Sequence, residues 1–396
     1  MCKFAINRYR QPDPQWSRDD RAAFESDDII EVHRSLPEYE QTPLISVPAL
    51  ADQLGVGQIL VKDESHRFGL KAFKALGATY AIYRYLKRDI DTHGDSLPDA
   101  SEFYRTPDII QPGSYTFCTA TDGNHGRGVA WAARKLNQRA VIYMPENTVP
   151  ARIENIRSEN AEVIIVDGNY DEAVRRCAAD AEKHGWQIIS DTSWPGYEEI
   201  PRWIMAGYTT MFREIHETPG EPADVDIVFV QAGVGSLAAA VAWYYNKANT
   251  GQTAKLVSVE PTDADCLLES IRSPGGNPTQ SLGKQDSVMA GLNCGTPSEV
   301  AWPLIKTGFD LFMSIPDHYS IEAMRRYYYP QGNDPQIISG ESGAAGLAAL
   351  IALLDSDSLT LARESLGLTS NSKILLLNTE GDTDPANFNA VVESSP

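Results

Sequence analysis

The sequence predicts an α/β protein with two domains, each built on a mostly parallel sheet flanked by helices. The chain has 396 residues, which favours two domains over one. Short β-branched runs alternate with helix-like segments along most of its length. Several of these runs, such as residues 226–231, are almost entirely apolar. That composition is typical of parallel strands that are covered by helices on both faces.

Nine short runs are predicted as strands: residues 58–62, 115–119, 140–144, 162–166, 187–190, 226–231, 255–260, 312–315 and 373–378. Helical patterns lie between them, for example at residues 73–87, 126–136, 170–184 and 201–215. Strands that alternate with helices in this way are joined by crossover connections, and such connections produce parallel pairing.

Two polar segments are predicted as connections. Residues 93–114 contain three prolines and no clear period, which indicates a domain crossing or an insertion. Residues 274–286 are rich in Gly, Pro, Ser and Gln and are expected to form a surface loop. For the whole chain we expect residues 1–100 and 190–396 to form a large domain that binds the ligand, and residues 101–189 to form a small inserted domain.

The composition excludes several classes of partner. The 34 basic and 54 acidic residues give a formal net charge of -20, which argues against nucleic acid and anionic membranes. No apolar run is long enough for a membrane helix, and residues 1–11 lack the apolar segment of a secretory signal. The five cysteines show no metal-binding spacing and fit reduced thiols in a cytoplasm, so no metal is expected. Whether Cys266 and Cys294 pair stays open.

A glycine-rich turn at residues 231–237 follows an apolar strand and begins a helix. Backbone N–H groups at such a turn, together with the positive end of the helix, can hold a phosphate. Ser236 could add a hydroxyl donor. The alternative is a turn that is glycine-rich only because it is tightly packed. The pattern is neither a Walker loop nor a complete Rossmann motif.

A second motif, residues 62–74, contains the lysine that is the strongest candidate for covalent chemistry. Lys74 stands at a predicted helix start beside Phe73, and a positive helix end and apolar neighbours both favour a neutral amine. Schiff-base chemistry requires that form. Lys62 and Lys71 are local competitors, and the alternative for each is an ordinary structural or solvated lysine.

A third motif, residues 119–126, also passes from a strand through a turn into a helix. Asp122, Asn124 and His125 are expected at the carboxyl end of the strand, where ligands bind in α/β folds. The alternative is a polar turn in which Asp122 only caps the following helix.

Together, and in this order, these motifs resemble the fold-type II pyridoxal phosphate (PLP) enzymes, the tryptophan synthase β-like family. Residues 378–384, Asn-Thr-Glu-Gly-Asp-Thr-Asp, match the family's hydroxyl-bearing loop near the C-terminus. Residues 339–347 look like its Glu-Pro-Ser-Gly-Ala segment, with Glu341 in place but without the proline. The resemblance spans nearly the whole chain and implies a PLP enzyme.

Within that family, the long forms of the motifs at residues 62–74, 121–131 and 378–384 are most similar to the branch that releases ammonia from 2,3-diaminopropionate. The simpler dehydratases have Ser-Ser-Gly-Asn-His at residues 121–125, so the acid at Asp122 is the informative difference. The alternatives are a serine, threonine or hydroxyaspartate dehydratase, a β-replacement enzyme, or a PLP-free binding protein. The presence of Lys74 argues against the last.

The resemblance also implies roles for individual residues. Lys74 would bind the cofactor as an imine and later move a proton, Asn124 would contact the phenolic oxygen, and Thr379 would contact the pyridine nitrogen. The expected cofactor-binding residues are Lys74, Phe73, Asn124, Gly233, Val234, Gly235, Ser236, Leu237 and Thr379.

The expected catalytic residues are Lys74, Asp122 and Asp191, with the two aspartates near the substrate. Bases on opposite faces, Lys74 and Asp122, would let both enantiomers of diaminopropionate react to pyruvate and ammonia. The alternative for Asp191 is a residue that only closes a strand end. A homodimer is expected because the family is usually dimeric, and the sparse cysteines favour a cytoplasmic location.

Overall fold

The computed structural model describes residues 1–94, 96–121, 123–146, 148–218, 224–246 and 254–394. The chain divides into two compact units. The first unit comprises Met1–Ser17, Gln41–His66 and Met211–Pro396, and the second comprises Arg18–Glu40 and Arg67–Thr210. The predicted small domain lies within the second unit, which also includes the flanking segments on both sides.

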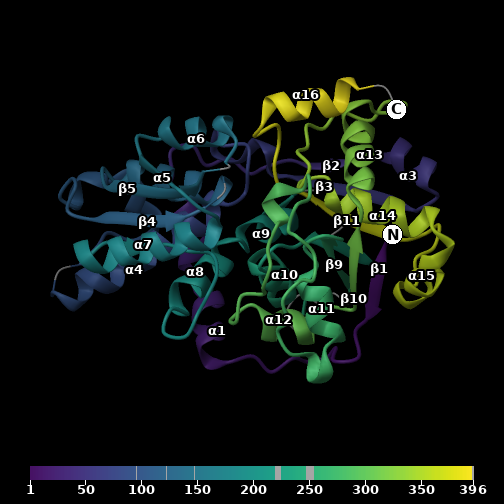
Figure 1. Ribbon diagram of the computed structural model, residues 1–396, viewed down its shortest axis with the longest axis horizontal. Helices are drawn as coiled ribbons and strands as arrows, with labels where there is room; N and C mark the ends of the chain where they lie inside the picture. The colour runs from purple at the N-terminus through teal and green to yellow at the C-terminus, as the bar shows by residue number, and fades with distance from the viewer. Residues whose placement is uncertain (95, 122, 147, 219–223, 247–253, 395–396) are drawn as a thin grey trace. The chain divides into compact units, whose positions relative to one another are not determined.

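The described part of the first unit contains a seven-stranded sheet in the order β1-β10-β9-β8-β11-β3-β2 (Figure 1). The five inner strands are parallel, whereas β1 and β2 pair antiparallel at the two edges. The strands are β1 (Lys3–Ile6), β2 (Leu44–Ser46), β3 (Gln58–Asp63), β8 (Ile227–Gln231), β9 (Lys255–Pro261), β10 (Leu311–Ile315) and β11 (Lys373–Asn378).

Helices cover both faces of this sheet. Alternate strand residues such as Ile227 and Phe229 join one apolar cluster, while Val228 and Val230 between them are also fully buried. The cluster includes side chains from α3 (Pro48–Leu54), α13 (Asp317–Tyr328), α14 (Ala345–Asp355), α15 (Thr360–Leu366) and α16 (Pro385–Glu393). The other face is covered by α10 (Ser236–Asn246), α11 (Cys266–Arg272) and α12 (Trp302–Gly308). The inner strands are therefore apolar on both sides, as parallel strands require.

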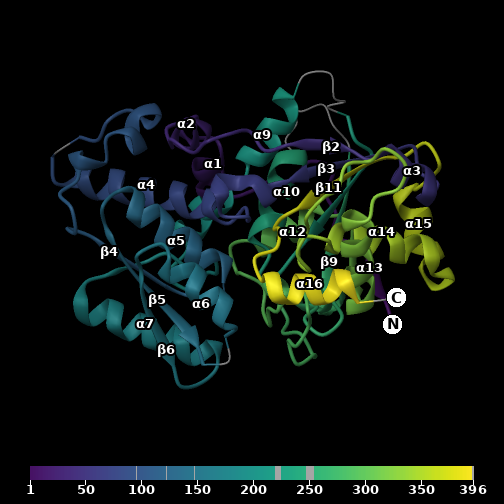
Figure 2. The same cartoon turned by 90° about the horizontal axis from the view of Figure 1, so that it is seen from above.

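The second unit contains a four-stranded parallel sheet in the order β6-β5-β4-β7 among its described residues. Its strands are β4 (Thr116–Ala120), β5 (Arg139–Pro145), β6 (Glu162–Val166) and β7 (Gln187–Ile188). Its helices include α1 (Arg18–Phe24), α2 (Asp28–Arg34), α4 (Ala75–Thr92), α5 (Asn124–Lys135), α6 (Pro150–Arg157), α7 (Tyr170–His184) and α8 (Glu199–Gly207). Figure 2 shows α7 and α5 beside this sheet.

The sheet of the second unit is covered by α7 on one face and α5 on the other. Cys118 and Tyr143 point to α7, where they cluster with Cys177. Ile142 faces α5, because a Cβ on Gly126 of α5 would lie 2.9 Å from its Cγ2. The N-terminus of α7 is fixed by a capping box at its first turn, a feature that stabilises a helix by about 1 kcal/mol.

The predicted α/β class and all nine predicted strands are confirmed, with ends that shift by one or two residues. The sequence did not reveal β1 and β2, which are short edge strands without an apolar run. The helix predicted at residues 201–215 is two helices, α8 and α9 (Thr210–Glu217). The long connection at residues 93–114 contains two short 3-10 helices, Ala100–Arg105 and Pro107–Ile109.

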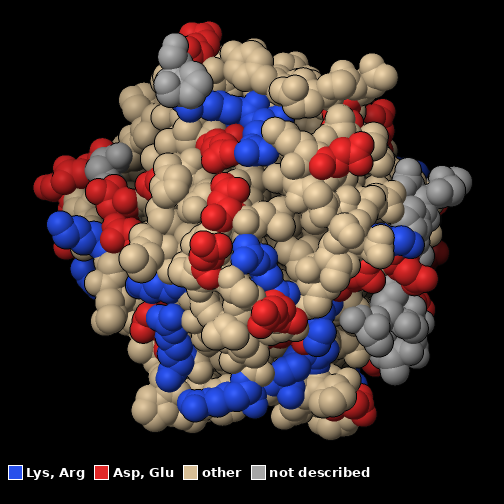
Figure 3. All heavy atoms as spheres, turned by 90° about the vertical axis from the view of Figure 1, so that its right-hand side faces the viewer, with Lys and Arg blue, Asp and Glu red and all other residues tan. Residues whose placement is uncertain are grey.

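On the face drawn in Figure 3, acidic and basic side chains are interspersed, so the negative charge is not gathered there in one patch.

Within the described residues no single helix is long and apolar enough to cross a membrane. One bent pair, Ala345–Asp355 with Asp357–Leu366, passes that test by combined length and composition alone. None of the five cysteines forms a disulfide bond, Cys266 and Cys294 included.

Candidate active site

Lys74 stands directly before α4 and reaches a carboxylate in its own unit. Its Nζ lies 2.6 Å from Oδ2 of Asp191, and the two side chains are 24% and 13% exposed. The competing lysines of the same motif differ. Lys71 is exposed, and Lys62 is fully buried in an ion pair with Glu214. Lys74 therefore combines a charged partner with partial access to solvent.

Asp191 follows β7 and has a second basic neighbour. Nδ1 of His125 lies 3.9 Å from Oδ2 of Asp191, and Nε2 of His125 lies 2.8 Å from the carbonyl oxygen of Ile189. Burial by itself raises the pKa of Asp191, but the charges of Lys74 and His125 and the hydrogen bond from Lys74 outweigh it. The pKa of Asp191 therefore falls well below its usual value. The group is a carboxylate at neutral pH.

Asn124 is the first residue of α5, at the carboxyl end of β4 as predicted. The turn before it is held by Thr121, whose Oγ1 accepts hydrogen bonds from the amides of Gly123 and Gly126. Asp122 lies outside the described residues. The sequence left open whether Asp122 caps α5. Thr121, which the sequence analysis did not single out, bonds the amides at this helix start.

The glycine-rich turn connects β8 to α10 in the first unit. Gly235 has a φ of +102°, and a Cβ there would lie 2.5 Å from Cδ1 of Ile305. A Cβ on Gly233 would lie 2.8 Å from Sγ of Cys294. Tight packing is therefore one reason for these glycines. The turn also leads into an 11-residue helix, whose first amides have no partner within the helix and can bind an anion. This arrangement fits a phosphate group.

Thr379 follows β11 and is 4% exposed. Its Oγ1 lies 3.0 Å from Nε2 of Gln231, the last residue of β8. The neighbouring Asn378 donates to Oδ1 of Asp63 at 2.7 Å. Parallel pairing therefore places the ends of β8, β11 and β3 together at one sheet edge, which is the usual position of ligand sites in α/β folds. Gln231 is a residue of this edge whose contacts the sequence did not predict.

Comparison with known proteins agrees with this arrangement. The family model described as "Pyridoxal-phosphate dependent enzyme" matches residues 36–364. The chain therefore belongs to the pyridoxal-phosphate-dependent enzymes, a class whose chemistry uses a lysine amine and a phosphate-binding site. The membership leaves no support for a PLP-free binding protein.

Relatives at higher similarity indicate a particular branch. The chain is 41% identical over 370 residues to the diaminopropionate ammonia-lyase of Salmonella typhimurium, covering 92% of this chain and 91% of that protein. The structure of the Escherichia coli diaminopropionate ammonia-lyase with D-serine superimposes with a TM-score of 0.87 at 37% identity, over 99% and 97% of the two chains. Its complex with an aminoacrylate-PLP azomethine intermediate gives 0.84 at 37% identity and the same coverage.

Proposed function

We propose that the protein is a PLP-dependent lyase that eliminates ammonia from 2,3-diaminopropionate and yields pyruvate and ammonia. The observation that carries this proposal is the 41% identity to a diaminopropionate ammonia-lyase over 92% of the chain. The ion pair of Lys74 with Asp191 supports it, because an acid beside the reactive lysine suits a substrate with two amino groups.

In this proposal Lys74 is the residue that holds the cofactor and moves a proton at the substrate Cα. Bound PLP withdraws electrons from Cα and so acidifies its proton. Asp122 would be the second base, on the opposite face from Lys74. Asp191 would bind the second ammonium group of the substrate once Lys74 has turned to the cofactor. The low pKa of Asp191 favours that role, since a carboxylate is the form that pairs with a cation.

The remaining proposed contacts orient the cofactor. The turn before α10 would bind the phosphate with backbone amides, and Thr379 would face the pyridine nitrogen. Asn124 would bind the phenolic oxygen from its position at the start of α5. The full proposed set is Lys74, Phe73, Asn124, Gly233, Val234, Gly235, Ser236, Leu237 and Thr379.

A second candidate function is elimination from a β-hydroxy amino acid. The complex of the E. coli relative with D-serine favours it, because that amino acid carries a hydroxyl where diaminopropionate carries its second amine. We further propose that the protein is a cytoplasmic homodimer. Sedimentation of the purified holoenzyme would test the dimeric state.

The test is an absorbance scan of the purified protein, followed by D- and L-diaminopropionate in separate assays with coupled detection of pyruvate. D-serine and L-serine, which would also yield pyruvate, run in parallel, and L-threonine is followed by the formation of 2-oxobutyrate. We expect an absorption band of the bound cofactor and pyruvate from diaminopropionate at the highest kcat/KM. Pyruvate from serine alone would favour the second candidate. A band with neither pyruvate nor 2-oxobutyrate from any of these substrates would contradict both candidate functions.

A matched pair of variants ties the activity to the proposed lysine. Lys74→Ala should lose pyruvate formation, because it removes the amine that holds the cofactor. Lys71→Asn is the control: Lys71 is exposed and has a φ of +59°, a conformation that asparagine tolerates. It should keep wild-type turnover. Turnover retained by Lys74→Ala would overturn the mechanism.

A further inference from the structure

The side chain of Gln231 is only 2% exposed, and its amide nitrogen lies among four oxygen atoms. Those acceptors are the carbonyl oxygen of Leu377 at 2.7 Å, Oγ1 of Thr379 at 3.0 Å, and the carbonyl oxygens of Ser342 and Gly343 at 3.1 Å each. All of them belong to the first unit. They come from the end of β11 and from the turn before α14, so one amide joins two separate segments to β8.

The chemistry of these neighbours fixes which way the amide of Gln231 points. Three of the four oxygens are main-chain carbonyls, and a carbonyl oxygen can only accept. The opposite orientation would place Oε1 against these three carbonyl oxygens, with no proton for any of the three contacts. The nitrogen must therefore occupy this position, and its two protons are shared among four acceptors.

The same reasoning fixes the role of the Thr379 hydroxyl. The amide nitrogen of Gln231 has no lone pair that can accept, so at this contact the hydroxyl oxygen is the acceptor. The single hydroxyl proton cannot point at Gln231 and must be directed elsewhere. Since Thr379 is 4% exposed, a buried donor of this kind needs an acceptor. Because the hydroxyl of Thr379 accepts from Gln231, its own proton is donated to a different partner.

We propose that Gln231 is a positioning residue for the cofactor, which holds the hydroxyl of Thr379 as a hydrogen-bond donor to the pyridine nitrogen of PLP. The inference rests on the proposed function, because Thr379 faces that nitrogen only in the proposed arrangement. A hydroxyl donor requires a nitrogen that carries no proton. Gln231 therefore keeps that nitrogen in its neutral, accepting form, through a residue that does not itself touch the cofactor.

A purely structural role would predict a different result. Gln231 could serve only to tie the end of β8 to β11 and to the turn at residues 342–343. Its loss would then lower stability and leave the pyridine nitrogen unchanged. The chain offers a control for that role. Gln138 is 7% exposed and bonds the backbone groups of Tyr115, Gln111 and Leu136, with no hydroxyl among these contacts.

The experiment uses holoenzyme reconstituted with PLP that carries ¹⁵N at the pyridine nitrogen. The ¹⁵N resonance and the PLP dissociation constant are measured for wild type, Gln231→Met, Thr379→Val, the double variant and Gln138→Met. We expect Gln231→Met and Thr379→Val to shift the ¹⁵N resonance in the same direction, toward the value of a pyridine nitrogen that accepts no hydrogen bond. PLP binding should weaken about fivefold, the value of one net hydrogen bond. The double variant should shift no further, and Gln138→Met should keep the wild-type resonance.

The milder Gln231→Asn, whose amide is one methylene too short to reach Thr379, covers the case in which Gln231→Met does not fold. It should give the same shift, whereas Thr379→Ser should keep the wild-type resonance. A wild-type resonance in a folded Gln231 variant would overturn the inference and leave the proposed function standing. A wild-type protein that takes up no PLP would overturn both.

Discussion

Lys62 and Lys74 stand at the two ends of one sequence motif, and each has its Nζ 2.6 Å from a carboxylate oxygen. The pair of Lys62 with Glu214 is completely sealed, with both side chains 0% exposed. The pair of Lys74 with Asp191 is 24% and 13% exposed. Two ion pairs of equal length thus differ in access, and access decides whether another molecule can replace one partner.

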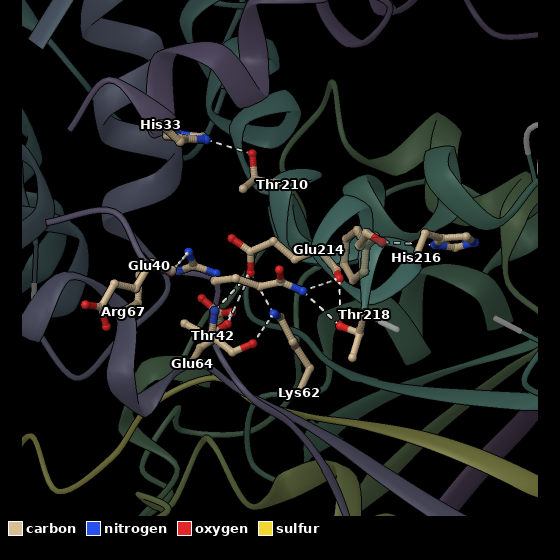
Figure 4. Close-up of polar contacts among 12 residues, drawn as sticks. His33, Glu40, Thr42, Lys62, Glu64, Arg67, Thr210, Glu214, His216 and Thr218 are labelled. Carbon is tan, nitrogen blue, oxygen red and sulfur yellow. Dashed lines mark hydrogen bonds and ion pairs between the residues drawn. The ribbon is translucent and has the colours of Figure 1, made fainter. Parts of the chain in front are cut away.

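The sealed pair is part of a larger hydrogen-bonded cluster, shown in Figure 4. Lys62 also donates to the carbonyl oxygen of Thr42 at 2.7 Å. The hydroxyl of Thr42 donates to Glu64 at 2.6 Å, and its amide donates to Glu214 at 3.3 Å. Buried charges are tolerated only when they are paired and hydrogen-bonded in this way. The cluster therefore stabilises the end of β3, and Lys62 cannot exchange its partner without unfolding this region.

The largest expected effect comes from breaking the sealed pair. Lys62→Met should lower the free energy of unfolding by about 3–5 kcal/mol, because it removes one partner of a fully buried ion pair. Urea unfolding of both proteins measures the change. The double variant Lys62→Met/Glu214→Leu should recover much of the loss, since it removes both charges. A loss below about 1 kcal/mol in the single variant would mean that this cluster does not hold β3.

Breaking the accessible pair should instead affect activity. Asp191→Asn removes the proposed carboxylate partner of the second substrate ammonium, an interaction of about 1.5–3 kcal/mol. We expect kcat/KM for diaminopropionate to fall about 10- to 100-fold. The loss of stability should be smaller than that of Lys62→Met, because this pair is partly accessible to solvent whereas the Lys62–Glu214 pair is not. Unchanged kcat/KM would remove Asp191 from the proposed substrate site.

The stabilities of the wild type and of Asp191→Asn should also depend differently on pH. The pKa of Asp191 is lowered in the folded protein, so its ionised form stabilises the fold above the unfolded-state pKa of about 3.9. That contribution is lost as the pH falls through the folded-state pKa, which lies below this value. In protein freed of cofactor, the stability difference between wild type and Asp191→Asn should be constant above about pH 5 and shrink below about pH 4. A constant difference down to pH 2 would contradict the lowered pKa.

Of the three ion pairs compared, the exposed pair of Lys87 with Asp28 should contribute least to the free energy of unfolding. Nζ of Lys87 lies 3.1 Å from Oδ2 of Asp28, with side chains 43% and 34% exposed. Lys87→Met should cost less than about 1 kcal/mol in unfolding experiments. The cost should shrink further as salt is added. A cost comparable to that of Lys62→Met would mean that burial does not rank these three pairs.

The part of the fold that the sequence predicted is the part that local composition determines. Strands β8, β9 and β11 are buried on both faces, so their apolar runs are visible in the sequence. The edge strands β1 and β2 have mixed composition, and only their pairing partners make them strands. The helix predicted at residues 201–215 breaks at Tyr208 and Thr209, where the hydroxyl of Thr209 bonds the carbonyl of Ala206.

The candidate site likewise contains residues that local motifs predict and contacts that depend on distant parts of the chain. Lys74, Asn124 and the glycine-rich turn stand out because their motifs are local and ordered along the chain. The carboxylate partners of Lys62 and Lys74 cannot be predicted from the motif, since Glu214 and Asp191 lie 152 and 117 residues away. Gln231 also escapes sequence analysis, because the groups that orient it lie between 111 and 148 residues further along.

The position of β11 has a consequence for how the chain is made. It lies between β8 and β3, and its last residue bonds to one that is 315 positions earlier in the chain. On the ribosome, β3 and β8 emerge long before the strand that joins them, and until then each presents an open edge to other chains. The second unit is complete once residue 210 has emerged. The first unit must wait for β11, so this unit of the nascent chain has the greater need of protection from aggregation.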